Sequence, residues 1–179
     1  MIKYSASMRY DLFFSSECSP VTTFALNPDK GLLASAFMGG RITIFDLKKA
    51  KVVASISFNE SHITTLIWSN DGKYICFGSQ DGSLAIYDLA TKNLNTTPKA
   101  HHRAVTALIA HPHDPIVISG GEDCVIKFWD LEGKLLRTIE YEKIISGDLF
   151  GVSQLCFNND GILYAGYFMK QDNLRIINT

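Results

Sequence analysis

The sequence predicts an all-β fold made of small sheets repeated along the chain. Val21, Ile63 and Val105 stand 42 positions apart, and each is followed 24 positions later by an aromatic residue next to aspartate. These closing pairs are Phe45-Asp46, Tyr87-Asp88 and Trp129-Asp130. A period near 40 that closes on such a pair is typical of a β-propeller, in which each unit is a four-stranded antiparallel blade. One blade cannot bury its own faces, so the blades must stack on one another.

A fourth, degraded unit follows the three regular ones. Residues 152–161 align with residues 63–72, and the unit closes on Ile177-Asn178, one position later than the other units do. The sequence therefore predicts a propeller with four recognisable blades.

The same periodicity divides the chain, which we expect to form one propeller domain. Residues 18–58 form blade 1, residues 59–100 blade 2, residues 101–147 blade 3 and residues 148–179 blade 4. Blade 4 has only three strands before the sequence ends. Residues 1–17 are expected to supply an outer closing strand, because residues 8–14 stand where the outer strand of a preceding blade would stand.

The strands within a blade follow from residue type. In blade 2, apolar and β-branched residues at 63–68, 74–77 and 84–87 predict three strands, and residues 94–97 a weaker fourth. Asn70-Asp71-Gly72 and Gln80-Asp81-Gly82 have the composition of tight turns between them. Blade 3 repeats this order at 105–110, 116–119, 125–129 and 135–139. No apolar stripe of helical period is present, so no helix is expected.

Composition narrows the functional classes. A formal net charge of −1 provides no general attraction to nucleic acid or to an anionic membrane. No apolar run approaches the roughly 20 residues that span a bilayer, and the first residues lack the apolar stretch of a secretory signal. The four cysteines are scattered without a CxxC pair, which favours free thiols in the cytoplasm or nucleus.

These units resemble the WD-repeat family. Trp129-Asp130 is the literal pair, and Phe45-Asp46 and Tyr87-Asp88 are common substitutes; the resemblance spans residues 18–179. It implies a β-propeller of eukaryotic type that acts as an intracellular interaction platform without a cofactor.

In that family a repeat often holds a histidine, a serine or threonine, an aspartate and the tryptophan in one buried hydrogen-bonded chain. The third unit matches this pattern with the four residues His101, Ser119, Asp123 and Trp129, here called the tetrad. The same types would suit a hydrolase, but Ser119 lies on a predicted inner strand without a sharp nucleophile turn, and no Gly-rich oxyanion hole is nearby. We therefore expect a structural tetrad, no catalytic residue and no enzyme activity.

A metal site is not expected either. His111, His113 and Asp114 lie in a turn bounded by prolines, and no further pair of ligands completes a coordination shell.

Apolar residues occupy predicted turns where polar ones are usual, as in Phe37-Met38-Gly39-Gly40-Arg41. Aromatic, Met and Arg side chains are enriched at protein interfaces. We expect a face that binds a protein or peptide, with the candidates Phe37, Met38, Arg41, Gln80, Arg103, Glu122, Phe168 and Met169.

Two questions stay open at this level. A substrate receptor of a ubiquitin ligase is an alternative role; receptors of that type often carry Arg two places after the closing Asp, where this chain has Lys48, Ala90 and Glu132. Four blades are also few for this family. Two copies that pair into an eight-bladed ring are favoured over a partial propeller completed by another chain, and both over a closed four-bladed ring.

Overall fold

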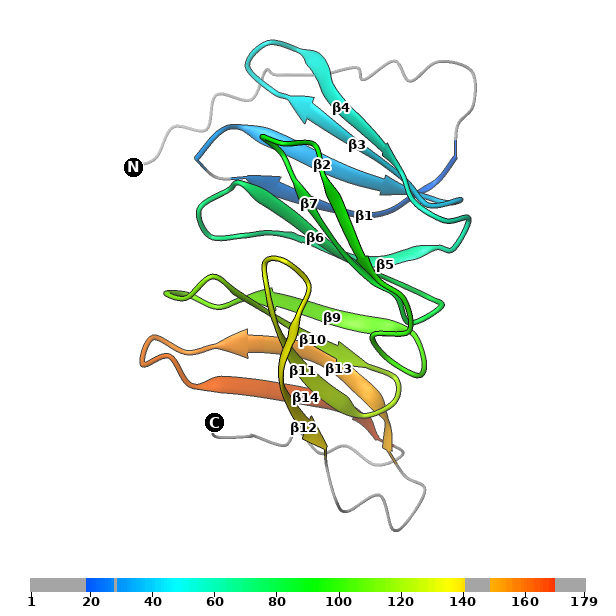
Figure 1. Cartoon of the computed structure of the whole chain (residues 1–179), viewed down its shortest axis with the longest axis vertical. Coiled ribbons are helices and arrows are strands. Elements are labelled where there is room, and N and C mark those ends of the chain that lie inside the picture. Colours follow the sequence, from blue (N-terminus) through cyan, green and yellow to red (C-terminus); the bar gives the residue numbers. More distant parts are fainter. Residues whose placement is uncertain (1–18, 28, 141–148, 170–179) are drawn as a thin grey trace, which may run out of the picture.

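The computed structural model describes residues 19–27, 29–140 and 149–169, and the side chains of residues 149, 150, 168 and 169 are not included in that description. Within these ranges the chain is all β, as predicted, and forms a propeller-type stack of antiparallel sheets (Figure 1). No helix in the described part is long and apolar enough to cross a membrane. The expected closing strand in residues 1–17 and the third strand of blade 4 lie outside the described residues.

Each of the first three blades is a four-stranded meander in which consecutive strands pair in order. The strands of blade 1 are β1 (Val21–Asn27), β2 (Leu32–Phe37), β3 (Arg41–Asp46) and β4 (Lys51–Ser57). Blade 2 has β5 (Ile63–Trp68), β6 (Tyr74–Ser79), β7 (Leu84–Asp88) and β8 (Leu94–Thr97). Blade 3 has β9 (Val105–Ala110), β10 (Ile116–Gly121), β11 (Val125–Asp130) and β12 (Leu135–Glu140). In blade 4, β13 (Leu149–Phe157) pairs with β14 (Leu163–Met169).

A bulge recurs near the start of the first strand of every blade. Val21 lies opposite Phe37 while Thr23 lies opposite Ala36, and the same shift occurs in β5, β9 and β13. Because a bulge leaves one residue unpaired and bends the strand, it turns that residue toward the neighbouring blade. The residue in the bulge is Thr22, Thr64, Thr106 or Ser153.

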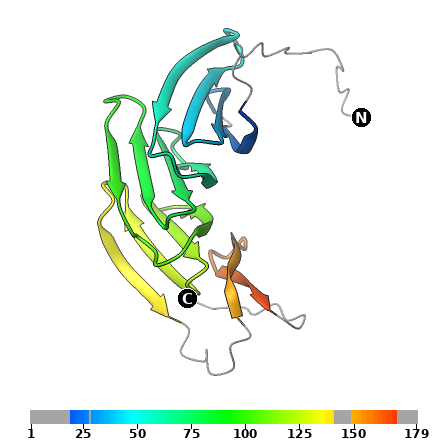
Figure 2. The same cartoon turned by 90° about the vertical axis from the view of Figure 1, so that its right-hand side faces the viewer.

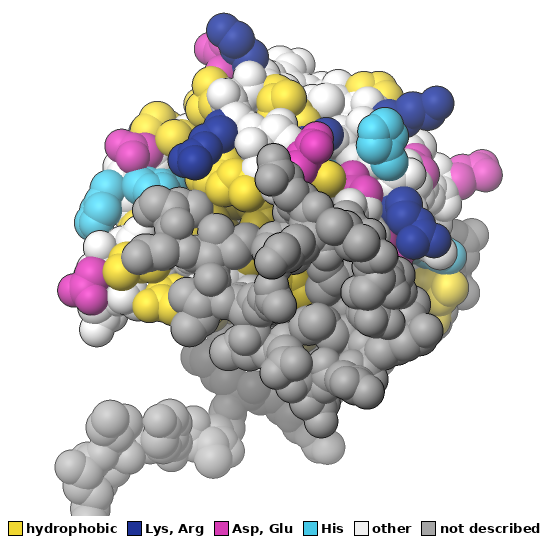
Figure 3. All heavy atoms as spheres, turned by 90° about the horizontal axis from the view of Figure 1, so that it is seen from below, with side chains coloured by type: hydrophobic (Ala, Val, Ile, Leu, Met, Phe, Trp, Pro, Cys, Tyr) yellow, Lys and Arg dark blue, Asp and Glu magenta, His cyan; other side chains and the backbone are white. Residues whose placement is uncertain are grey.

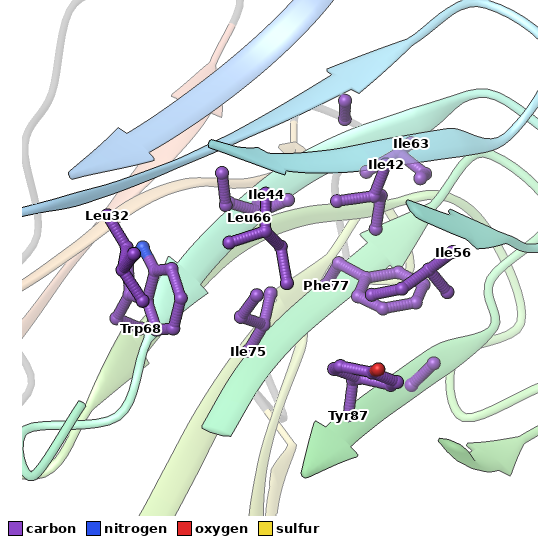
Figure 4. Close-up of a cluster of buried hydrophobic side chains, with 13 residues drawn as sticks. Leu32, Ile42, Ile44, Ile56, Ile63, Leu66, Trp68, Ile75, Phe77 and Tyr87 are labelled. Carbon is purple, nitrogen blue, oxygen red and sulfur yellow. The ribbon is translucent and has the colours of Figure 1, made fainter. Parts of the chain in front are cut away.

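The core consists of three layers, each between two successive blades. The layer between blades 1 and 2 buries Ile42, Ile44, Ile63, Leu66 and Phe77 together with their neighbours (Figure 4). A second cluster joins blades 2 and 3, and a third joins blades 3 and 4. The most extensive contacts across these layers join the first strands of successive blades, which are β1 with β5, β5 with β9 and β9 with β13. The second strands β2, β6 and β10 also contact the first strand of the next blade.

The four blades lie along an open arc. Figure 2 shows blade 1 and blade 4 at opposite ends of a curved stack, with the concave side open between them. No comparable packing joins β1–β4 to β13 or β14 within the described residues. The described strands therefore do not form the closed four-bladed ring that was one of the three alternatives.

Candidate functional site

The tetrad is assembled from two strands, one turn and one loop of blade 3. Ser119 lies on β10, Trp129 on β11, Asp123 in the turn between them, and His101 in the loop before β9. The indole nitrogen of Trp129 donates to Ser119 Oγ at 2.8 Å, and Ser119 Oγ lies 2.7 Å from His101 Nε2. His101 Nδ1 lies 2.9 Å from Asp123 Oδ1. The structure thus brings the four predicted residues together in one continuous hydrogen-bonded chain.

The hydrogen bonds of Asp123 decide which atoms of the tetrad donate and which accept. Asp123 also accepts hydrogen bonds from the backbone N–H groups of His102 and Val125. Burial alone would raise the pKa of the Asp123 carboxyl, but the hydrogen bond from His101 and these backbone bonds outweigh it, so the pKa is lowered from 3.8. A carboxylate at this position accepts a hydrogen bond from His101 Nδ1–H, which leaves Nε2 to accept a hydrogen bond from the Ser119 hydroxyl.

The tetrad has no room for a substrate. His101 and Ser119 are fully buried, and both hydrogen-bonding partners of the Ser119 hydroxyl are side chains of the tetrad. Gly121 closes the space further, because a Cβ at that position would lie 2.6 Å from His101 Nδ1 and from Asp123 Oδ1. This geometry fits a structural network better than a nucleophile, which must reach its substrate.

Blade 2 keeps half of this network. Asn59 stands at the histidine position, and its Nδ2 donates to Asp81 Oδ2 at 2.7 Å. Asp81 also accepts from Ser79 Oγ at 2.6 Å and from the Ser83 backbone N–H. An amide therefore replaces the imidazole on the aspartate, while Phe77 at the serine position makes an edge contact with Phe58 instead.

The predicted binding face lies at the second turns of the blades, which repeat one geometry. The backbone N–H groups of Met38, Gln80 and Glu122 donate to the carbonyl oxygens of Pro20, His62 and Ala104, at 2.8–3.0 Å. The three side chains therefore occupy equivalent positions on successive blades, and all three are exposed, as is Arg103 in the adjoining loop.

Two other candidates of this turn behave differently. Phe37 is only 3% exposed, and the guanidinium of the partly buried Arg41 lies 5.1 Å from the centre of its ring. Phe37 is therefore part of the blade interior rather than a residue that a partner can touch. Phe168 and Met169 end β14, and their side chains lie outside the described part of the chain.

The histidine turn forms a small cavity of about 240 Å³ between blades 2 and 3. His111 Nδ1 lies 3.2 Å from Asp114 Oδ2 and accepts the Asp114 backbone N–H, so it is engaged within its own turn. The described residues include no group of three or more His, Cys, Asp or Glu side chains that would suit a metal ion.

Charged side chains of both signs are mixed on the face seen from below (Figure 3). In the view from below, basic, acidic and histidine side chains are interspersed around the molecule (Figure 3). A protein that follows a nucleic-acid backbone needs a basic stripe, and this view of the molecule does not present one.

The repeated blades, the stacked cores and the buried tetrad define a β-propeller of the WD-repeat type. Within that class, the chain belongs to the family of nucleolar protein 10-like N-terminal domains, whose β-propeller model matches residues 7–171. A comparison with curated proteins gives no match.

Among solved structures, the chain resembles the crystal structure of the computationally designed Ika4 protein. The two share 24% sequence identity and a TM-score of 0.72, over 92% of this chain and 94% of that one. At this identity the likeness concerns the fold, and it confirms the propeller architecture.

Sequence reasoning missed the polar contacts between blades. The hydroxyl of Thr64 hydrogen-bonds to the carbonyl oxygen of Val105 in the next blade, and that of Thr106 to the carbonyl oxygen of Val152. The recurrence of a hydroxyl residue directly after Val21, Ile63, Val105 and Val152 is the signal that would have found them.

Proposed function

We propose that this protein is a non-catalytic scaffold that binds protein or peptide partners through the second turns of its blades. The observation that carries the proposal is the repeated placement of Met38, Gln80 and Glu122 by equivalent backbone hydrogen bonds. Backbone bonds of this kind fix where each turn lies, so three exposed side chains are presented at regular intervals on a rigid framework.

The exposed side chains at the second turns and the adjoining loop, here called the turn face, suit a ligand with both apolar and polar groups. The turn face offers the thioether of Met38, the amide of Gln80, the carboxylate of Glu122 and the guanidinium of Arg103. A peptide that combines an apolar residue with polar or charged neighbours would satisfy all of them, and Met and Arg are enriched at protein interfaces.

The family also suggests where the scaffold works. Its description names a nucleolar protein, and we propose that this chain acts in the nucleus, in assemblies of the nucleolus. WD-type propellers are typically non-catalytic, and the buried tetrad supports that assignment here. We further propose that the arc of blades is completed by association with another copy of the chain.

The test is capture of partners from nuclear extract by the tagged chain and two variants. Met38→Glu with Arg103→Glu alters the turn face, while His113→Glu with Lys134→Glu alters exposed residues at the opposite turns. All three chains should melt at the same temperature. We expect the first variant to lose specific partners that the wild type and the second variant retain; equal capture by all three would contradict the proposal.

A further inference from the structure

The two ends of the arc carry complementary halves of the contact that joins its blades. In each of two internal junctions, a β-branched residue near the start of one blade packs against a residue without a side chain in the blade before it. A Cβ on Gly78 would lie 2.4 Å from Val105 Cγ1, and a Cβ on Gly120 would lie 2.4 Å from Val152 Cγ1. The absence of a side chain at these two glycines is what lets the blades approach.

At the start of the arc, the equivalent β-branched residue is not covered as the others are. Val21 is equivalent to Ile63, Val105 and Val152, because each lies on one side of the recurring bulge. Ile63, Val105 and Val152 are fully buried, whereas Val21 is 51% exposed. Phe24 departs from its equivalents even more: it is 68% exposed, while Leu66, Leu108 and Leu155 are 4%, 8% and 7% exposed.

At the other end of the arc, the small residue is present. Gly166 lies opposite Gln154, just as Gly78 lies opposite Thr65 and Gly120 opposite Ala107. Gly78 and Gly120 are buried by the following blade, and Gly166 is partly exposed.

The polar part of the junction is available at this end as well. Thr64 and Thr106 bond to the carbonyl oxygens of Val105 and Val152, each directly before the bulge of the following blade, and Ser153 offers a hydroxyl at the equivalent position of blade 4. Val21 supplies the carbonyl that corresponds to those of Val105 and Val152. Apolar contact, close approach and hydrogen bond can therefore all form between the two ends.

We propose that a second copy of this chain docks head to tail, with Val21 and Phe24 of one copy packed on the Gly166 face of the other. The junction continues the one already made inside the chain, with the same residue types at the same register. Because an arc presents both ends, two copies can exchange both contacts and close into one ring of eight blades. Burial of Phe24 and its neighbours removes apolar surface from water and stabilises the pair.

The experiment is the absolute mass of the full chain by light scattering on a sizing column, across a range of concentrations. We expect the mass of a dimer, which is twice the chain mass of 19.9 kDa. Phe24→Asp and Gly166→Leu should each reduce the mass to that of a single chain. Val53→Asp is the matched control, because Val53 is also exposed but lies on the outer strand β4; this variant should keep the dimer mass.

A mixture of the two variants gives a second test of the head-to-tail contact. In a pair formed by Phe24→Asp and Gly166→Leu chains, one of the two junctions contains only unchanged residues. The mixture should therefore recover part of the dimer that neither variant forms alone, at a higher dissociation constant than the wild type.

Four results would overturn the proposal. They are a wild-type mass of one chain at all concentrations, a dimer that survives both variants, a ladder of larger masses instead of a closed pair, and solubility only together with a different polypeptide. The last would mean that another chain completes the propeller. None of these results depends on partner capture at the turn face, so they do not decide the proposed scaffold function.

Discussion

Trp129 and His101 hold the Ser119 hydroxyl between them, with the Trp129 indole nitrogen 2.8 Å and His101 Nε2 2.7 Å from Ser119 Oγ. The two contacts satisfy the donor and the acceptor of a hydroxyl that water does not reach. They also tie the loop before β9 to two inner strands of the blade. The tetrad thereby fixes the position of the turn that displays Glu122.

Two replacements of Trp129 should distinguish how much its packing and its hydrogen bond each contribute to the free energy of unfolding. Trp129→Ala removes a buried ring and is expected to lower the free energy of unfolding by about 3–5 kcal/mol. Trp129→Phe retains most of the volume but loses the N–H donor, so a loss of about 1–3 kcal/mol is expected. Urea unfolding followed by circular dichroism measures both. Equal stability of Trp129→Phe and the wild type would show that the hydrogen bond to Ser119 contributes nothing.

Acid should weaken the tetrad through Asp123. Since the pKa of this carboxyl is lowered from 3.8 in the folded state, its stabilising effect is fully present above about pH 4 to 5 and is lost as the pH falls through the folded-state value. Asp123→Asn lacks this titration. The stability difference between wild type and variant should therefore be constant near neutral pH and shrink below pH 3.8. A difference that grows on acidification would contradict the assignment.

Close approach between blades 2 and 3 should make Gly78 intolerant of a side chain. Gly78→Val would place atoms on Val105 and is expected to cost about 1–3 kcal/mol. Val105→Ala restores part of the space, so the double variant should lose less than the sum of the two single changes. Gly161→Ala, where an added Cβ meets nothing within 4 Å, controls for the loss of a glycine elsewhere, although its positive φ adds some backbone strain. Additive losses for Gly78 and Val105 would mean that the two residues do not share one space.

The cysteines should differ sharply in reactivity. Burial raises the pKa of the Cys76 thiol to about 12, with a further contribution from the charge of Asp71, whereas Cys156 is exposed. Thiolates react and thiols do not, so alkylation at pH 8 should label Cys156 within minutes and Cys76 only after unfolding. Peptide mass mapping distinguishes the two sites. Rapid labelling of Cys76 in the folded protein would show that the second core layer opens readily.

Asn59 should matter less than its counterpart in blade 3. Asn59→Ala removes one hydrogen bond to Asp81, which keeps its bonds to Ser79 and Ser83. His101→Ala removes both links of a buried chain and leaves a cavity. Thermal unfolding should show the larger shift for His101→Ala, and a reversed order would contradict the ranking of the two networks.

The strands were predictable because they depend on local pattern. Residues 63–68 are mostly β-branched or aromatic, and the strand observed there is Ile63–Trp68. The four tetrad residues were also accessible from the sequence, because the repeat places them at fixed spacings. What spacing does not contain is the distance between blades. The bond from Thr64 to Val105 depends on that distance, so it could not be derived from one unit alone.

The fourth blade shows a second limit of periodicity. Its first turn is one residue shorter than in blade 2, since Leu163 lies opposite Phe157 where Ile75 lies opposite Trp68. Alignment with blade 2 by residue spacing alone would place the side chain of Tyr164 against blade 3. In the observed pairing, Leu163 and Ala165 lie against blade 3 instead, and both are buried.

The stacking of each blade on its immediate neighbours alone has a consequence for how units can be added or removed. Every junction uses the same kinds of residue, so the surface that blade 2 offers to blade 3 is equivalent to the one that blade 1 offers to blade 2. Excision of residues 63–104 would therefore set Val105 beside Ala36, in the place that Ile63 now fills. The number of blades can therefore change by whole units: an in-frame duplication or deletion can add or remove a blade without changes to the blades that remain.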